Sequence, residues 1–259
     1  MLPNSFDIFG NIAVLKFDSK ISKKDKVAVA RELIRQHSSI KTVVEKSNKF
    51  SGRLRTMKTS YLAGEKTKIA VYKENNCVFR FDIDKTYFSP RLSNERKEIA
   101  LQVKKNEKVL VMFAGVAPFS IVIAKLAKPK IVYSVEINRA ASKFAEENVR
   151  INKAWNVEVI QGDVKKVMHK FVKQKLKFSR IVMARPQLKE SFLKWAFMVI
   201  KKGGIINYYG FAKSPDEVVN VIKDEAKKSK KKIKINLVKR AGNIAPYRYR
   251  WRVDMRVIN

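Results

Sequence analysis

The feature that most constrains the fold of this chain is a buried strand that runs into a tight turn and then a helix, over residues 108–121. Apolar residues fill 109–113, and Ala114 and Gly115 are small enough for the backbone to approach a ligand closely. Pro118 suits the first turn of a helix, where its missing N–H is no loss. Turns of this kind hold nucleotide-like cofactors in α/β proteins, so the segment predicts a cofactor-binding turn.

An acidic residue follows this turn at a suitable distance. The next apolar run covers 130–137, and Glu136 near its end lies 21 residues after Gly115. A carboxylate at the tip of the second strand, about 20 residues past the turn, is well placed to accept hydrogen bonds from ribose hydroxyls. An ordinary strand–helix–strand unit with no ligand is the alternative, and the spacing alone leaves it open.

The chain divides into a small part and a larger one. Up to about residue 80 the pattern predicts an α+β domain, with a helix near 24–37 and strands near 12–17, 42–45, 68–72 and 77–82. From about residue 95, apolar strands alternate with longer helical patterns, which is typical of a parallel sheet covered on both faces. We therefore expect two domains, residues 1–80 and 81–259.

The larger domain is predicted to hold seven strands, of which the last two follow each other without a helix and should pair antiparallel. The strands are expected at 109–113, 131–137, 157–161, 180–183, 204–209, 233–239 and 250–257. The helices are expected to begin near Asn94, Pro118, Arg139, Val164, Leu188 and Pro215.

The net charge predicts a polyanionic partner. The chain has 57 Lys and Arg against 23 Asp and Glu, a formal charge of +34, which is far more than solubility requires. A dense cluster at 227–234 contributes to it, although that cluster alone is also typical of a solvated helix end. No convincing basic amphipathic helix with exposed aromatic residues is present, so nucleic acid is favoured over a membrane surface.

Cysteine and histidine are too few for structural metal or disulfide chemistry. Cys77 is the single cysteine, and with only His37 and His169 beside it no zinc cluster is expected. The sequence has no apolar run of 18 residues, and its first residues lack the pattern of a secretory signal. We therefore expect a cytoplasmic protein without a metal.

Other polar residues are predicted to meet at the same sheet edge. The third strand ends in Gly162 and Asp163, and Asp163 either contacts a cofactor or caps the next helix. After the fourth strand, Pro186 stops the strand pairing and directs the loop 184–187 to this edge. Before the sheet, Glu95 and Arg96 open a helix, although Asn94 as a cap and Glu95 as a first-turn acid explain that segment equally.

Five segments together closely resemble the archaeal and eukaryotic tRNA (guanine37-N1)-methyltransferase family. They are residues 87–92, 95–96, 112–121, 135–138 and 203–209, and the likeness runs from about Phe6 to Asn259. The resemblance implies an α/β fold, a Rossmann-like class I methyltransferase sheet preceded by a small α+β domain that helps to bind tRNA. It also implies S-adenosylmethionine as the cofactor. Many members carry a further small domain ahead of the matched region, which this chain is expected to lack.

The same resemblance assigns roles to individual residues. Glu95 matches a proposed general base that takes the proton from guanine N1, and Arg55 matches an arginine that stabilises the charge then left on the base. Neutral guanine is protonated at N1 and is a poor nucleophile, so a carboxylate and a cation suit this reaction. The base must also leave its stack to reach the methyl group.

The cofactor-binding residues implied by the resemblance include Glu136 as the ribose contact and Asp163 with Val164 as the adenine contact. Tyr87 and Arg96 match positions at the cofactor edge. The whole set is Tyr87, Arg96, Phe113, Ala114, Gly115, Glu136, Ile137, Asp163, Val164, Ala184 and Pro186.

Three departures from the family pattern bear on activity. Val111 replaces an aspartate, Ala117 replaces a glycine, and 184–186 reads Ala-Arg-Pro where the family usually has Asn-Leu-Pro. Losing the asparagine removes a polar group beside cofactor and base, so the choice of substrate and the rate stay open.

The leading hypothesis is a monomeric enzyme that methylates N1 of guanosine 37 in the anticodon stem-loop of tRNA. Relatives that modify C7 of a wyosine precursor at the same position share this fold, so a C7-methyltransferase or a bifunctional enzyme is an alternative. The Ser-Pro-Arg-Leu segment at 89–92 argues against transfer of an aminocarboxypropyl group. A non-catalytic RNA-binding protein with a degenerate cofactor site is a third reading. The single-glycine turn and the charge argue against a nicotinamide dehydrogenase.

Overall fold

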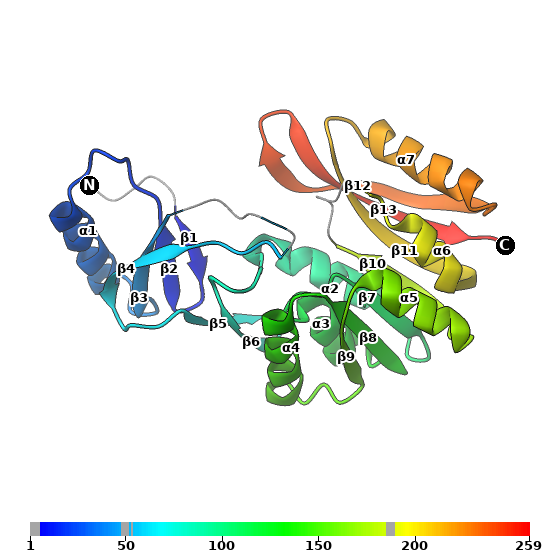
Figure 1. The fold of residues 1–259 in the computed structure, drawn as a ribbon, viewed down its shortest axis with the longest axis horizontal. Coiled ribbons are helices and arrows are strands. Elements are labelled where there is room, and N and C mark those ends of the chain that lie inside the picture. Colours follow the sequence, from blue (N-terminus) through cyan, green and yellow to red (C-terminus); the bar gives the residue numbers. More distant parts are fainter. Residues whose placement is uncertain (1–5, 48–51, 53, 185–189) are drawn as a thin grey trace.

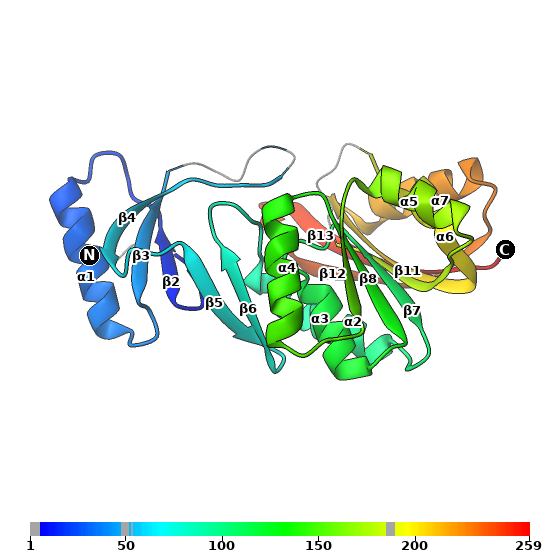
Figure 2. The same ribbon diagram turned by 60° about the horizontal axis from the view of Figure 1, so that its bottom comes forward.

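The computed structural model describes residues 6–47, 52, 54–184 and 190–259. Three parts follow one another along the chain: an N-terminal module, a two-stranded hairpin and a large mixed sheet with helices on both faces (Figure 1). The hairpin lies between the other two parts (Figure 2).

The N-terminal module is a four-stranded sheet covered by one helix. Its strands are β1 (Asp7–Phe9), β2 (Ile12–Leu15), β3 (Thr42–Lys46) and β4 (Thr59–Gly64), in that spatial order, and the helix is α1 (Lys23–Gln36). Strands β2 and β3 are parallel, because α1 crosses between them. The predicted helix and the first two predicted strands are confirmed. The short edge strand β1 and the polar edge strand β4 were not predicted.

The hairpin consists of β5 (Ile69–Glu74) and β6 (Cys77–Asp82), as predicted. Its two-residue turn places Asn75 at φ 47° and Asn76 at φ 58°. Asparagine tolerates this left-handed backbone better than most residues, and two such residues in succession suit the twist of a tight hairpin.

The large sheet has the seven predicted strands in the order β12-β13-β11-β10-β7-β8-β9. The first five along the chain, β7 to β11, are parallel, and β13 pairs antiparallel with both β11 and β12. The strands are β7 (Lys108–Met112), β8 (Ile131–Glu136), β9 (Val157–Gln161), β10 (Phe178–Met183), β11 (Ile200–Ala212), β12 (Ile233–Ala245) and β13 (Arg248–Val257). The antiparallel pairing of the last two strands is confirmed.

Helices cover the two faces of this sheet in groups of three (Figure 1). The first group is α2 (Ser93–Gln102), α3 (Pro118–Ala127) and α4 (Arg139–Ile151), and a short 3₁₀ helix at Pro90–Leu92 precedes α2. The second group is α5 (Val164–Lys173), α6 (Leu193–Val199) and α7 (Pro215–Lys228). Alternate side chains of β7 enter the two cores, Val109 and Val111 on the first face and Leu110 and Met112 on the second. Helix α6 begins at Leu193, later than predicted.

An asparagine of α4 and the asparagine that caps its C-terminus join the hairpin to the large sheet. Asn148 accepts a hydrogen bond from the backbone N–H of Arg80 at 2.7 Å and donates to its carbonyl at 3.0 Å. One helical turn later, Asn152 makes the same pair of bonds to Val78, at 2.8 and 2.6 Å. The outer edge of β6 is therefore paired by side-chain amides where a neighbouring strand would otherwise be needed.

We predict that Asn148→Ala lowers the free energy of unfolding by about 3 kcal/mol, because it leaves the buried Val116 carbonyl and the partly buried backbone N–H and carbonyl of Arg80 without their partner. Urea denaturation followed by circular dichroism measures the change. Glu146→Ala, at an exposed position of the same helix, is the control and should change stability by less than about 0.5 kcal/mol. Equal stability of the two variants would contradict the bracing role of Asn148.

Candidate functional site

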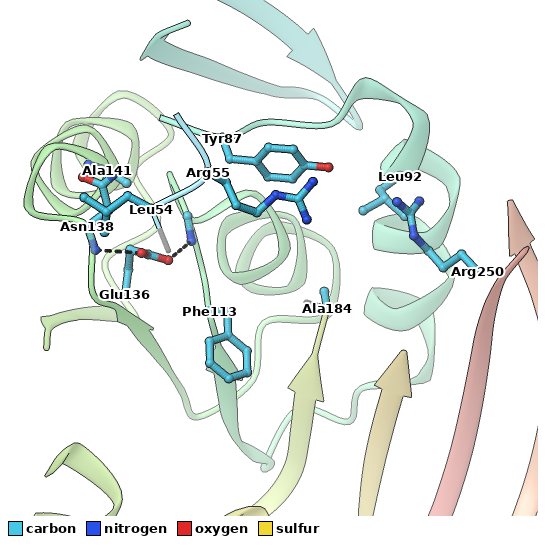
Figure 3. A pocket seen from close by; sticks show the side chains of 11 residues that line it. Leu54, Arg55, Tyr87, Leu92, Phe113, Glu136, Asn138, Ala141, Ala184 and Arg250 are labelled. Carbon is cyan, nitrogen blue, oxygen red and sulfur yellow. Dashed lines mark hydrogen bonds between the residues drawn. The ribbon is translucent and has the colours of Figure 1, made fainter. Parts of the chain in front are cut away.

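A cavity with an empty volume of about 530 Å³ lies at the carboxyl ends of the parallel strands (Figure 3). This is the edge of an open α/β sheet where ligands bind. Six of its lining residues belong to the predicted site: Arg55, Tyr87, Phe113, Gly115, Glu136 and Ala184. Five others were not predicted: Leu54, Leu92, Asn138, Ala141 and Arg250.

The turn after β7 has an unusual backbone. Phe113, Gly115 and Ala117 all have positive φ, at 61°, 59° and 64°. Only glycine adopts this conformation without strain, so Phe113 and Ala117 hold a locally costly backbone in this turn. Residue 117 is the position where the family usually has glycine. A Cβ at Gly115 would lie 3.4 Å from the carbonyl oxygen of Tyr87, which keeps this part of the wall close-packed.

The Glu136 carboxylate is fixed at one end of the cavity. One oxygen accepts a hydrogen bond from the Gly115 N–H and the other from the Asn138 N–H, both at 2.8 Å (Figure 3). Asn138 in turn caps α4 through the N–H groups of Ala140 and Ala141. The turn, the tip of β8 and the start of α4 are thus linked through one carboxylate, whose remaining lone pairs can accept hydrogen bonds from a ligand hydroxyl.

Arg55 comes from the N-terminal module and reaches the cavity from the segment between β3 and β4. Its guanidinium lies 4.0 Å from the centre of the Tyr87 ring (Figure 3). At this distance the cation is attracted to the face of the ring, which holds it over the cavity wall. The N-terminal module and the large sheet therefore both contribute to the cavity.

Glu95 does not line the cavity. Leu92, three residues earlier, lines the cavity, whereas Glu95 is buried with 5% of its surface exposed. Helix α2 begins at Ser93 with Leu92 as its N-cap, so the reading of Asn94 as the cap is wrong. Glu95 lies in the first turn, where a carboxylate is favoured by the helix dipole.

Three donors surround the Glu95 carboxylate. Oε2 accepts hydrogen bonds from the Tyr209 hydroxyl and from Arg252 Nη1, each at 2.8 Å, and Oε1 lies 3.2 Å from Lys239 Nζ. Burial, reinforced by the neighbouring Glu95 charge, raises the pKa of Tyr209 well above its usual value, so the hydroxyl keeps its proton and donates it.

One donor of Glu95, Arg252, belongs to a buried polar chain that crosses the sheet. Arg252 Nε lies 3.2 Å from Asp254 Oδ1, which accepts a hydrogen bond from Asn207 at 2.7 Å. Asn207 accepts from Arg180 at 3.1 Å, and Arg180 pairs with Glu107 at 2.9 Å. Each charge is met by an opposite charge or an amide, so the chain is stable in the interior.

Arg96 is also predicted for the cofactor edge, but it does not line the cavity. Its guanidinium forms a doubly hydrogen-bonded ion pair with Glu74 of the hairpin and donates to the Ser89 carbonyl at 3.0 Å. It is 1% exposed. The structure gives Arg96 an architectural contact, and its role as a cofactor ligand stays a prediction.

The remaining predicted residues lie near the edge without lining the cavity. Ala114 is buried behind the turn, and Ile137 follows Glu136 at the strand end. Asp163 is the N-cap of α5 and accepts from the Lys165 N–H at 2.8 Å, and Val164 is buried at the start of that helix. Asp163 therefore caps the helix, which is one of the two roles expected from the sequence, and its contact with an adenine stays a prediction. Pro186 lies outside the described residues.

Sequence signals existed for some of the lining residues that were missed. Asn138 directly follows the predicted acidic residue and precedes a helix, which is a typical cap position. Arg250 belongs to an alternation of arginine and aromatic residues over 247–252. Leu54 adjoins the predicted Arg55. Leu92 and Ala141 line the cavity only because of how their helices pack.

The cavity suits a nucleoside better than a metal ion. Leu54, Phe113 and Ala141 offer apolar surface, and the Glu136 carboxylate offers an acceptor for a ribose diol. Among the described residues, no group of three or more His, Cys, Asp or Glu is arranged to hold a metal. Within the same residues, no helix is long and apolar enough to cross a membrane.

Comparison with known proteins assigns nearly the whole chain. The family described as "TRM5/TYW2 methyltransferase domain" matches residues 70–235, and the "TYW2 N-terminal domain" matches residues 1–67.

Three relatives are informative. The tRNA (guanine(37)-N(1))-methyltransferase Trm5b of Pyrococcus abyssi is 36% identical over 99% of this chain and 76% of its own length. The tRNA 4-demethylwyosine(37)-methyltransferase Taw21 of Saccharolobus solfataricus is 36% identical over 78% of this chain and 76% of its own. The tRNA (guanine(37)-N(1))/4-demethylwyosine(37)-methyltransferase Taw22 of Nanoarchaeum equitans is 34% identical over 98% of this chain and all of its own.

Solved structures agree with the fold. The complex of aTrm5 and tRNALeu has a TM-score of 0.87 at 28% identity, and covers all of this chain and 73% of its own. Methanocaldococcus jannaschii Trm5 in complex with adenosine has a TM-score of 0.84 at 28% identity, covering all of this chain and 75% of its own. The class I methyltransferase fold predicted from the sequence is confirmed.

We predict that Arg252→Met lowers the free energy of unfolding by about 3–5 kcal/mol, because it leaves the buried carboxylates of Glu95 and Asp254 without their shared cation. Urea denaturation measures the loss. Arg256→Met, at an exposed position of the same strand, is the control and should change stability by less than about 0.5 kcal/mol. A loss no larger for Arg252→Met than for the control would show that the ion pairs do not hold the site.

Proposed function

We infer the function from one premise, which is that the chain belongs to the TRM5/TYW2 methyltransferase family. It is an S-adenosylmethionine-dependent methyltransferase. We propose that it methylates N1 of guanosine 37 in tRNA, as the names of its Pyrococcus and Methanocaldococcus relatives state for those proteins.

One observation of the structure carries this proposal. Arg55, supplied by the N-terminal module, lies against Tyr87 on the wall of the cavity that Glu136 closes at its other end. A cation from one part of the chain therefore meets the cofactor cavity of another part. This is the arrangement needed if RNA bound across both parts is to present a flipped base to the cavity.

The lining residues fit the cofactor. In the proposal, the Glu136 carboxylate accepts hydrogen bonds from the ribose hydroxyls, and Phe113 and Ala141 contact its apolar parts. Gly115 has no side chain to block the approach to the turn. When bound, S-adenosylmethionine supplies a methyl group activated by a sulfonium.

The residues of the chain would then prepare the base. Glu95 takes the proton from guanine N1, whose electron pair forms the new bond to carbon, and Arg55 stabilises the negative charge that shifts to O6. Oε2 of Glu95 is already engaged by Tyr209 and Arg252, so Oε1, which contacts Lys239, is the oxygen we assign to the proton. Leu92 lines the cavity and Glu95 does not, so in this proposal the wall around Leu92 rearranges as the base enters.

Methylation of C7 of a 4-demethylwyosine-type precursor is a second candidate. It is favoured by the match of residues 1–67 to the TYW2 N-terminal domain and by the Taw21 and Taw22 relatives. Ala184 lines the cavity where the family usually has a larger asparagine, which leaves more room for a tricyclic base.

The tRNA anticodon stem-loop is the partner in both candidates, and the charge of +34 suits it. The monomeric state and the cytoplasmic location stay predictions.

We predict that purified protein with S-adenosylmethionine converts guanosine 37 of an unmodified tRNA transcript to 1-methylguanosine. Mass spectrometry of the nucleosides identifies the product, and a tRNA carrying 4-demethylwyosine at position 37 is tested in parallel. Product from the second tRNA alone would favour the C7 activity, and product from both would indicate a bifunctional enzyme. If neither tRNA gives a product and calorimetric titration with the cofactor shows no heat, the non-catalytic reading remains.

We predict that Glu95→Gln slows methyl transfer by about 100-fold or more, because the amide cannot take the proton from N1. The substitution keeps an oxygen for Tyr209 and Arg252, so cofactor binding measured by calorimetry should be unchanged. Glu98→Gln is the matched control, because Glu98 contacts the same Arg252 and Lys239 one turn further along α2. Wild-type rates in Glu95→Gln would exclude Glu95 as the base.

A further inference from the structure

Arg250 of β13 is a largely buried cation for which the described residues provide no anionic partner. Its side chain belongs to a residue that is only 8% exposed, its Nε has no hydrogen-bond partner, and no carboxylate of the described residues pairs with it. The ring of Phe211 lies 5.4 Å from the guanidinium carbon. Burial lowers the pKa of Arg250 from its ordinary value, which reflects the cost of holding this charge away from water.

The neighbouring Arg252 shows how such a charge is normally stabilised in this protein. It lies two residues further along the same strand, is also buried, and its Nε likewise makes no hydrogen bond, but its charge is paired with Glu95, Glu98 and Asp254. A buried charge without such partners is strongly unfavourable. The isolation of Arg250 is therefore specific to its position, and it indicates a missing anionic partner.

Arg250 lies where two cavities meet. It lines the cofactor cavity at the side away from Glu136 (Figure 3), and it lines a second hollow with an empty volume of about 980 Å³. Arg55 and Tyr87 also line both. The second hollow contains Arg91 and one acid, Asp7, which are paired with each other at 3.0 Å, so Arg55 and Arg250 leave it with an excess of positive charge.

A bulge in β12 exposes the guanidinium to this hollow. The pairing of β12 with β13 shifts register between Arg240 and Gly242 and again between Asn243 and Ala245. Gly242 sits in the bulge at φ 138°, and the nearest atom to a Cβ built there is Arg250 Nη1, at 3.9 Å. A larger side chain at 242 would cover the guanidinium, and the glycine leaves it open.

We propose that Arg250 binds a backbone phosphate of the target nucleotide, and so anchors the flipped nucleotide with its base in the cofactor cavity. This inference rests on the proposed function and names the contact that positions its RNA substrate. A guanidinium binds phosphate through two parallel hydrogen bonds, and a formal negative charge satisfies the buried cation better than the neutral acceptors of a base edge do. The nucleotide must span both cavities, and Arg250 lies at their junction.

The test combines a protein variant with an RNA variant. A synthetic anticodon stem-loop is made with a methylphosphonate, which removes the charge, on either side of the target guanosine. We expect Arg250→Gln to lower kcat/KM for the unmodified stem-loop by about 10- to 100-fold, as expected for a lost hydrogen bond to a charged group. One of the two methylphosphonates should lower the wild-type value by a similar factor, and the same methylphosphonate should lower the variant no further.

Controls separate this contact from a structural role. Arg256→Gln, on the exposed end of the same strand, should match the wild type on every RNA. Arg250→Lys keeps the positive charge but lacks the two parallel N–H donors of the guanidinium, and should retain part of the activity. The urea midpoint of Arg250→Gln should not fall below that of the wild type, because the variant removes an unpaired buried charge.

Other outcomes are equally definite. The proposal would be overturned if, for each methylphosphonate, the loss in kcat/KM of the combined substitution equalled the product of the two separate losses. Full activity of Arg250→Gln would also overturn it. A weaker affinity of Arg250→Gln for S-adenosylmethionine, measured by calorimetry, would instead assign Arg250 to the cofactor carboxylate. If the wild type binds the stem-loop without methylating it, the proposed function fails, and the same double substitution read out by filter binding still tests the phosphate contact.

Discussion

Two consecutive charged residues of α2 determine how the three parts of the molecule meet. Glu95 pairs with Arg252 of the large sheet, whereas Arg96 pairs with Glu74 of the hairpin. All four residues are buried, and a buried charge that loses its partner is strongly destabilising. The two pairs therefore fix α2 between the sheet and the hairpin. The position of the hairpin in turn determines the position of the N-terminal module that adjoins it. The position of Arg55 on the wall of the cavity depends on this arrangement.

The sequence predicted the large sheet well because its signals are local. The strands β7 to β11 each contain apolar residues in succession or alternation and end in a turn or loop, and their alternation with helices implies parallel pairing. The link from Glu136 to Gly115 could be predicted for the same reason, since both lie at strand ends whose order in the sheet follows from the topology. Elements without strong periodicity, such as β1 and β4 at the edges of the small sheet, carried no comparable signal.

The candidate site was only partly predictable, because its contacts join residues far apart in the sequence. Glu95 meets Tyr209 and Arg252 across 114 and 157 residues. From the sequence, Arg96 is an arginine near the cofactor edge, and only the fold reveals that Glu74 occupies its guanidinium. Arg250 could be noticed in its run of arginine and aromatic residues, but its isolation depends on a bulge in the opposite strand that no local pattern specifies.

The contrast between Arg250 and Arg252 separates stability from function on one strand. Arg252 is surrounded by acids and joins the polar chain that runs to Glu107, so its charge contributes to holding the sheet and α2 together. Arg250 has no such acid, so its burial lowers the stability of the free protein. Natural proteins tolerate locally unfavourable features, such as an unpaired buried charge, mainly at functional sites. Since Glu136 occupies the opposite end of the cavity, the unsatisfied charge marks the end that the RNA substrate would fill.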